Sequence, residues 1–161
     1  MKVDIAVQAL VDGEVEFVII GGWSAILHGS AHMTDDLDIC FSRKIANLRR
    51  LARSLAPYHP RLRDLPPNLP LIWDESTLRN GAIFALNTDL GAIDLLADVP
   101  GVGSFGDVAA ASVESDAFDR KVRILDLKSL IKAKRTAGRD KDLRVLPELE
   151  ALLEAQEPDN V

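Results

Sequence analysis

The stretch GGWSAILHGSAHMTDDLDIC, residues 21–40, joins a pair of glycines to a run in which three of four consecutive residues are aspartates. The aspartates lie directly against Ile39 and Cys40, which have the character of a strand interior. Like charges that are held this close repel one another, so one carboxyl group becomes protonated unless a cation is present. The stretch therefore predicts a positively charged partner at this place in the fold.

The length and composition of the chain predict one compact domain. With 161 residues and 47% hydrophobic residues the chain can bury a core but is too short for two ordinary domains. No apolar run approaches the roughly 18 residues that span a bilayer, the N-terminus lacks the pattern of a secretory signal, and the one cysteine cannot form an internal disulfide. We expect a single domain over residues 1–156 and a frayed tail over residues 157–161, in a cytoplasmic protein with no membrane partner.

Hydrophobic patterning predicts an α/β or α+β arrangement around residues 21–40. The apolar, β-branched run at 15–20 is typical of a strand buried on both faces, and it is followed by a glycine turn, a short helix at 23–27 and a second strand through Leu37 and Ile39. Residues 82–87 and 92–97 alternate like the two strands of a hairpin, and residues 113–125 like another.

Helical spacing and punctuation residues complete the expected order. Helices are expected over residues 3–11, 45–55, 104–111 and 126–138, and Pro147 begins or kinks a last helix. Residues 57–70 contain five prolines, which predicts a surface loop of unusual length without regular elements.

Three acidic residues are the candidate metal ligands. On a strand, Asp36 and Asp38 project from the same face, so both carboxylates point into one space. Asp94 is flanked by Ile93 and Leu95 in a strand that otherwise carries no charge, and a carboxylate there requires a partner. Ligands that offer only oxygen favour Mg²⁺ or Mn²⁺. Taken alone, three aspartates near the start of a strand are more often a solvated turn than a catalytic site.

The glycine pair and a basic segment indicate an anionic ligand beside these acids. Gly21 and Gly22 end a strand and lead into a helix, so unblocked backbone N–H groups can meet the phosphates of a nucleoside triphosphate. Residues 120–144 contain ten Lys or Arg and three Asp, a net charge of +7 in a chain of −6. This segment is either the solvated face of a helix or a cationic wall for phosphates.

A second glycine motif offers an alternative site. Gly101, Gly103 and Gly106 match the G-x-G-x-x-G pattern of dinucleotide-binding turns. The strand before them belongs to an expected antiparallel hairpin and Pro100 directly precedes them, so a parallel βαβ unit is not supported. We interpret these glycines as a tight connection.

The glycine pair followed by TDDLDI resembles the signature of the polymerase-β superfamily of nucleotidyltransferases. The chain is most similar to its small bacterial members, the AbiEii-like or minimal nucleotidyltransferases, several of which are toxins of toxin–antitoxin pairs. The resemblance extends through WDESTLRNGAIFALNTDLGAIDLLADVPGVG and LDLKSLIKAKRTAGRDKDLRVLPEL. It implies a mixed sheet flanked by helices and transfer of a nucleoside monophosphate from a triphosphate such as ATP to an acceptor hydroxyl.

The resemblance also implies roles for individual residues. Asp36, Asp38 and Asp94 would hold the metal and carry the catalysis, Lys134 would approach the phosphates, and Ser24 would join the two glycines in binding the nucleotide. Relatives commonly have Arg where this chain has His32, which donates to phosphate only as a weaker and pH-dependent substitute. The implied partners are a nucleoside triphosphate, an RNA (tRNA) or protein acceptor, and an antitoxin.

Three hypotheses of different classes follow. The first is a metal-dependent nucleotidyltransferase. The second is a nucleotide-binding or antitoxin-like partner that keeps the fold while His32 marks a loss of chemistry. The third is a structural protein whose acids are merely exposed, which predicts no dependence of thermal stability on metal.

Overall fold

The computed structural model describes residues 1–66, 68–69 and 71–157. Within these residues seven strands form one sheet in the order β3-β4-β5-β2-β1-β9-β8. Their bounds are β1 Phe17–Ile20, β2 Asp36–Phe41, β3 Arg61–Leu62, β4 Ile83–Thr88, β5 Gly91–Leu96, β8 Ser112–Ala117 and β9 Arg120–Leu125. Strand β2 is antiparallel to β1 and parallel to β5, while β1 is parallel to β9, so the sheet is mixed. The predicted fold class is confirmed.

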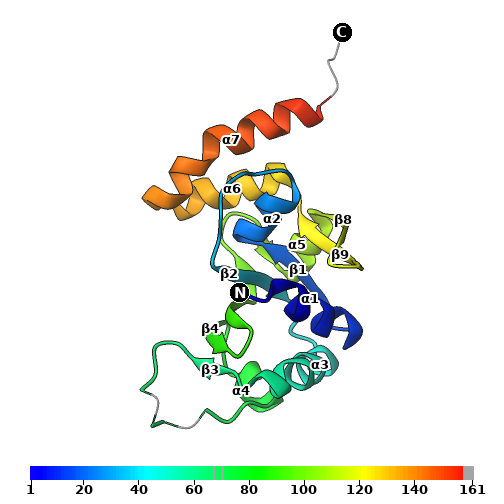
Figure 1. The fold of residues 1–161 in the computed structure, drawn as a ribbon, viewed down its shortest axis with the longest axis vertical. Coiled ribbons are helices and arrows are strands. Elements are labelled where there is room, and N and C mark those ends of the chain that lie inside the picture. The colour runs from blue at the N-terminus through cyan, green and yellow to red at the C-terminus, as the bar shows by residue number, and fades with distance from the viewer. Residues whose placement is uncertain (67, 70, 158–161) are drawn as a thin grey trace.

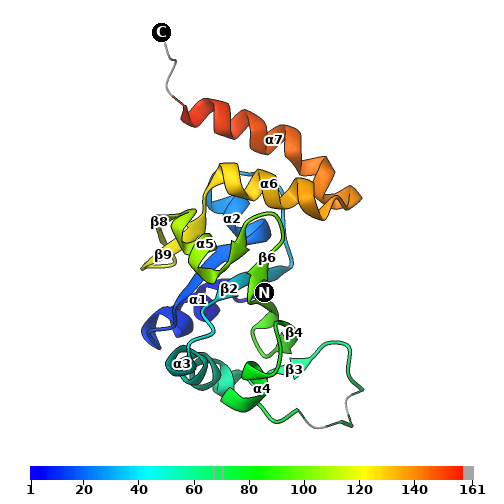
Figure 2. The same ribbon diagram turned by 180° about the vertical axis from the view of Figure 1, so that it is seen from behind.

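Helices flank the sheet and pack against one another at both ends of the molecule. Their bounds are α1 Val3–Asp12, α2 Gly21–Leu27, α3 Ile45–Leu55, the 3₁₀ turn η1 Ala56–Tyr58, α4 Glu75–Arg79, α5 Phe105–Ala110, α6 Leu127–Ala137 and α7 Asp140–Gln156. Figure 1 shows α7 lying along α6 at one end and α3 with α4 at the other, and Figure 2 shows the same arrangement from behind. Across the described residues, no helix combines the length and apolar character needed to cross a membrane.

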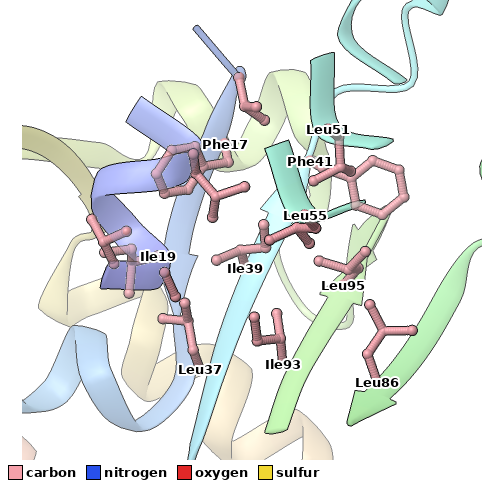
Figure 3. Packing of buried hydrophobic residues seen from close by; sticks show 14 of the residues in the cluster. Phe17, Ile19, Leu37, Ile39, Phe41, Leu51, Leu55, Leu86, Ile93 and Leu95 are labelled. Atoms are coloured by element: carbon pink, nitrogen blue, oxygen red, sulfur yellow. The ribbon is translucent and has the colours of Figure 1, made fainter. Parts of the chain in front are cut away.

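Period-two alternation along the central strands divides the core into two parts. Leu37 and Ile39 of β2 point to one face, where they pack with α1 and α3; Figure 3 shows Ile39 between neighbouring strands and close to Leu55 of α3. Val18 and Cys40 point to the opposite face and pack with α5, α6 and α7. Asp36 and Asp38 alternate with Leu37 and Ile39, so their side chains lie on the face that α6 and α7 cover.

The two predicted hairpins are confirmed as β4–β5 and β8–β9. The second glycine motif also lies in a hairpin, because the short strands β6 Asp98–Val99 and β7 Gly103–Ser104 are antiparallel. Gly101 and Gly103 have φ values of +85° and +131°, which other residues rarely adopt. The interpretation of these glycines as a tight connection is therefore confirmed.

The structure contradicts the expectation that the proline-rich segment has no regular element, and it contradicts one of the two alternatives given for Pro147. The segment 57–70 includes η1 and the edge strand β3, which proline tolerates because an edge strand leaves N–H groups unpaired; Pro67 and Pro70 lie outside the described residues. The last helix does not begin at Pro147, which lies inside α7. It begins at Asp140, because the side chain of Asp142 accepts a hydrogen bond from the backbone N–H of Arg139 at 3.3 Å. Of the expected tail, residues 158–161 are outside the described residues.

Candidate metal and nucleotide site

The sheet brings the three acidic side chains together. Asp38 of β2 pairs with Asp94 of β5 in the parallel register, and Asp36 lies two residues earlier on the same face of β2. One carboxylate oxygen from each of the three lies within 4.8 Å of the other two. Each of these residues is partly buried, so their mutual repulsion is only incompletely screened by water. The cluster offers oxygen ligands alone, which is the donor set of Mg²⁺ and Mn²⁺.

Asp38 carries the electrostatic cost of this arrangement. Burial, followed by the negative charges of Asp36 and Asp94, raises the pKa of Asp38 to about 7, and the positive charge of Lys134 opposes this increase. A carboxyl group with this pKa is partly protonated at neutral pH. A dication at the cluster would replace that proton and convert the repulsion into ligation.

The two glycines allow the backbone to approach the acids closely. Gly21 has a φ of +62°, and a Cβ atom there would lie 2.3 Å from Oδ2 of Asp38. A Cβ atom on Gly22 would lie 2.7 Å from the Cβ atom of Thr34, whose hydroxyl donates to Oδ1 of Asp36 at 3.0 Å. Any larger side chain would therefore disturb Asp38 or the support of Asp36. The sequence analysis did not single out Thr34, for which a hydroxyl two residues before Asp36 is the only signal.

A cavity of about 550 Å³ connects the acids with the basic segment. The glycines and the three acids line it together with four cations: Lys134 of α6, Arg139 at the N-cap of α7, and Lys141 and Arg144 of α7. Other cations of the same segment pair elsewhere; Arg120, for example, binds Asp12 at 2.8 Å. The segment 120–144 is therefore partly a cationic wall of this cavity and partly surface.

A buried acid holds two of these cations in place. Asp142 has no exposed side-chain surface, and its oxygens accept from Nζ of Lys134 at 3.2 Å and from Nε of Arg139 at 2.6 Å. Burial by itself raises the pKa of Asp142, but the hydrogen bonds from Arg139 and Lys134 outweigh it and hold the pKa below the ordinary value. The sequence analysis identified Lys134 but missed Asp142, whose signal was an acid within a basic run.

Ser24 and His32 are engaged with protein groups. Ser24 is fully buried, its hydroxyl donates to the carbonyl of Leu125 at 2.9 Å, and it does not line the cavity. His32 lines the cavity, and its Nδ1 lies 3.0 Å from Glu148 of α7. Glu148 also accepts from the hydroxyl of Ser30, and chiefly this bond, followed by that of His32, lowers its pKa to about 2. The loop that carries His32 is thereby tied to α7.

An arginine that the sequence analysis did not consider also reaches the acids. Nη2 of Arg63 lies 2.9 Å from Oδ1 of Asp94. Arg63 follows β3 within the proline-rich segment, where no local pattern distinguishes it from a surface arginine.

Comparisons with solved structures identify this architecture. The lincosamide antibiotic adenylyltransferase LnuA, in a lincomycin-bound crystal structure, is similar with a TM-score of 0.62 and 13% identity over 94% of this chain and 96% of that chain. A putative nucleotidyltransferase from Thermotoga maritima is similar with a TM-score of 0.57 and 16% identity, over 91% of this chain and 88% of that chain. The antibiotic-resistance factor ANT(2'')-Ia is similar with a TM-score of 0.53 and 14% identity, over 95% of this chain and 88% of that chain. No protein-family model and no curated protein sequence matches the chain. At these identities the similarity establishes the architecture, and the chain has a nucleotidyltransferase fold.

Proposed function

We propose that the protein is a metal-dependent nucleotidyltransferase that moves a nucleoside monophosphate from a nucleoside triphosphate to an acceptor hydroxyl. The observation that carries this proposal is the convergence of three carboxylates within 4.8 Å on the face of a nucleotidyltransferase fold that a cationic wall covers. Asp36, Asp38 and Asp94 would hold Mg²⁺ or Mn²⁺, which suits their oxygen-only donor set. When bound, such an ion neutralises charge on the reacting phosphates.

Other residues of the chain would bind and orient the triphosphate and the acceptor. Gly21 and Gly22 let the triphosphate approach the backbone beside Asp38, and Lys134, oriented by Asp142, faces the phosphates from α6. Ser24 would contribute indirectly, because its bond to Leu125 fixes α2 and thus the glycine turn. The acceptor hydroxyl enters on the side of Asp94. The hydroxyl gives its proton to the carboxylate of Asp94 as its oxygen forms a bond to the α-phosphorus. The bond between the α-phosphorus and the oxygen that bridges it to the β-phosphorus breaks, and pyrophosphate leaves with that oxygen.

Two observations bear on the acceptor. Two of the similar proteins are named for antibiotics or resistance to them, which supports a small hydroxylated molecule. The cations of residues 120–144 support an RNA such as tRNA, since phosphate contacts dominate RNA and DNA affinity. A protein acceptor, a toxin role and an antitoxin partner belong to the same proposal and are supported by the sequence resemblance alone.

The test is transfer of label from each of the four α-labelled nucleoside triphosphates, with Mg²⁺ or Mn²⁺, to RNA, to protein and to lincosamide acceptors such as lincomycin. The double variant Asp36→Asn, Asp38→Asn should abolish transfer. Asp119→Asn is the matched control, because Asp119 is exposed, lies outside the cavity and has a φ of +58° that Asn tolerates. Absence of transfer across all nucleotides and acceptors would contradict the proposal.

The engagement of His32 by Glu148 favours a second candidate, a nucleotide-binding protein without chemistry. In this case the ring is already bonded and does not reach a phosphate. Calorimetry separates the two functions: triphosphate binding without turnover, unchanged by Asp94→Ala except for metal affinity, favours the second.

A further inference from the structure

Arg63 makes a set of contacts that a surface arginine does not need. Its Nη2 donates to Oδ1 of Asp94 at 2.9 Å and to the carbonyl of Leu86 at 3.0 Å, and its Nε donates to Oδ1 of Asn87 at 3.3 Å. Only 33% of the Arg63 side chain and 23% of the Asp94 side chain are exposed. Three acceptors around a planar fork define both the position and the orientation of the guanidinium.

The register of the sheet explains how Arg63 reaches Asp94. The backbone N–H of Arg63 donates to the carbonyl of Ala85 at 2.8 Å, Ala85 pairs with Asp94, and Asp94 pairs with Asp38. Residues that lie opposite one another in a sheet share a face, so these four side chains form a row across adjacent strands. The backbones of Arg63 and Asp94 lie two strand spacings apart, about 10 Å. The small side chain of Ala85, on the strand between them, leaves room for the long side chain of Arg63 to reach Asp94.

We propose that Arg63 is the positioning residue of Asp94, a role that rests on the proposed function of the site. By holding one carboxylate oxygen, Arg63 fixes the rotation of the Asp94 carboxylate and the direction in which it faces Asp36 and Asp38. The guanidinium is a cation with no lone pair for a metal, so it offsets negative charge without competing as a ligand. The proline-rich segment therefore supplies a part of the site.

Charge and position predict different effects, which makes the proposal testable. Removing the charge removes a cation that repels Mn²⁺, so Arg63→Gln should raise Mn²⁺ affinity, by up to about tenfold. Loss of the planar guanidinium and its hydrogen bonds lets the Asp94 carboxylate rotate. We therefore expect kcat to fall by about 10- to 100-fold with little change in KM for the nucleotide. Arg63→Lys keeps the charge and loses the fork, so it should lower kcat while Mn²⁺ affinity stays unchanged.

The experiment measures Mn²⁺ affinity by electron paramagnetic resonance without substrate, together with kcat, KM and melting temperature, for wild type, Arg63→Gln and Arg63→Lys. Ala85→Leu tests the same contact without changing Arg63. The larger side chain would occupy the space through which Arg63 reaches Asp94, so kcat should fall in the same way. Arg61→Gln is the control: Arg61 is exposed, and its ion pair is with Asp89 at 3.9 Å. It should change kcat and Mn²⁺ affinity by less than about twofold.

Two results would overturn the role of Arg63. One is a kcat within about threefold of wild type in both Arg63 variants. The other is a joint loss of Mn²⁺ affinity and melting temperature in both variants, which would mean that the contact only stabilises the fold. If wild type transfers no nucleotide, the proposed function fails by itself. A substrate-free Mn²⁺ affinity that is higher in Arg63→Gln than in wild type still supports the place of the arginine beside Asp94, and an unchanged or lower affinity overturns it.

Discussion

Replacing Asp142 with Ala should lower the free energy of unfolding by about 2–4 kcal/mol. Removing one partner of a fully buried ion pair costs about 3–5 kcal/mol, because the other charge loses its compensation. Here Asp142 has no exposed surface, but 18% of the Lys134 side chain and 61% of the Arg139 side chain are exposed. Water solvates the exposed parts of these cations when Asp142 is removed, which lowers the expected loss from about 3–5 to about 2–4 kcal/mol.

Thermal and urea unfolding measure this loss, and for a chain of this size about 3 kcal/mol corresponds to a decrease in Tm of about 6–12 °C. The direction of this pKa shift determines how the contribution of Asp142 to stability changes with pH. Because the pKa of Asp142 is lower in the folded state, its stabilisation is complete above the pKa of an unfolded aspartate and is lost as the pH falls through the folded pKa. The difference between wild type and Asp142→Asn should therefore shrink in acid.

Asp140 provides the control for this prediction. It is exposed in the first turn of α7, so Asp140→Asn should cost less than about 1 kcal/mol. A loss below about 1 kcal/mol for Asp142→Ala, or a difference between wild type and Asp142→Asn that stays constant into acid, would refute the reasoning from burial and pairing.

Three further perturbations test other parts of the site. Gly21→Ala should weaken Mn²⁺ binding by about tenfold or more, because its Cβ would displace Asp38; Gly106→Ala, where a Cβ meets nothing within 4 Å, is the control in the same titration. Mn²⁺ affinity should fall as the pH is lowered below the Asp38 pKa of about 7, whereas the metal-free protein should become more stable on acidification from about 7 toward 4, since the folded state binds this proton more tightly. Glu148→Gln should increase amide hydrogen exchange at Ala31, whose N–H donates to Glu148 at 3.1 Å, and equal exchange in both proteins would show that this bond does not hold the loop.

The strands and the acids were predictable because their signals are local. Alternation around Leu37 and Ile39 and around Ile93 and Leu95 sets the faces of β2 and β5, and an acid between two buried residues must point to the opposite face. The structure confirms both strands and adds the parallel register that places Asp38 beside Asp94. Register between strands from distant parts of the chain is not contained in either strand alone.

The contacts that support the site were not predictable for the same reason. Arg63 lies 31 positions before Asp94 in the sequence, and the only pattern in its own segment is the recurrence of proline. Lys134 and Asp142 are only eight positions apart, but they meet because Gly138, with a φ of +64°, turns the chain from α6 into α7. The start of α7 at Asp140 was not predicted, and Pro147 was given as either its start or a kink, because the side chain that caps the helix, Asp142, has a residue type more often found on surfaces.

The supporting contacts also explain how opposite charges can share one cavity without collapsing onto each other. Lys134 is close enough to Asp38 to lower its pKa, so in a site without other contacts the lysine would be drawn onto the acids and would block the space that the proposed function assigns to a metal and a triphosphate. Asp142 holds Lys134 on the helical side, while Arg63 occupies one oxygen of Asp94 on the sheet side. Each charge is thus partly satisfied in a fixed position. We infer that this is why the cavity stays open toward a ligand that carries both a dication and phosphates.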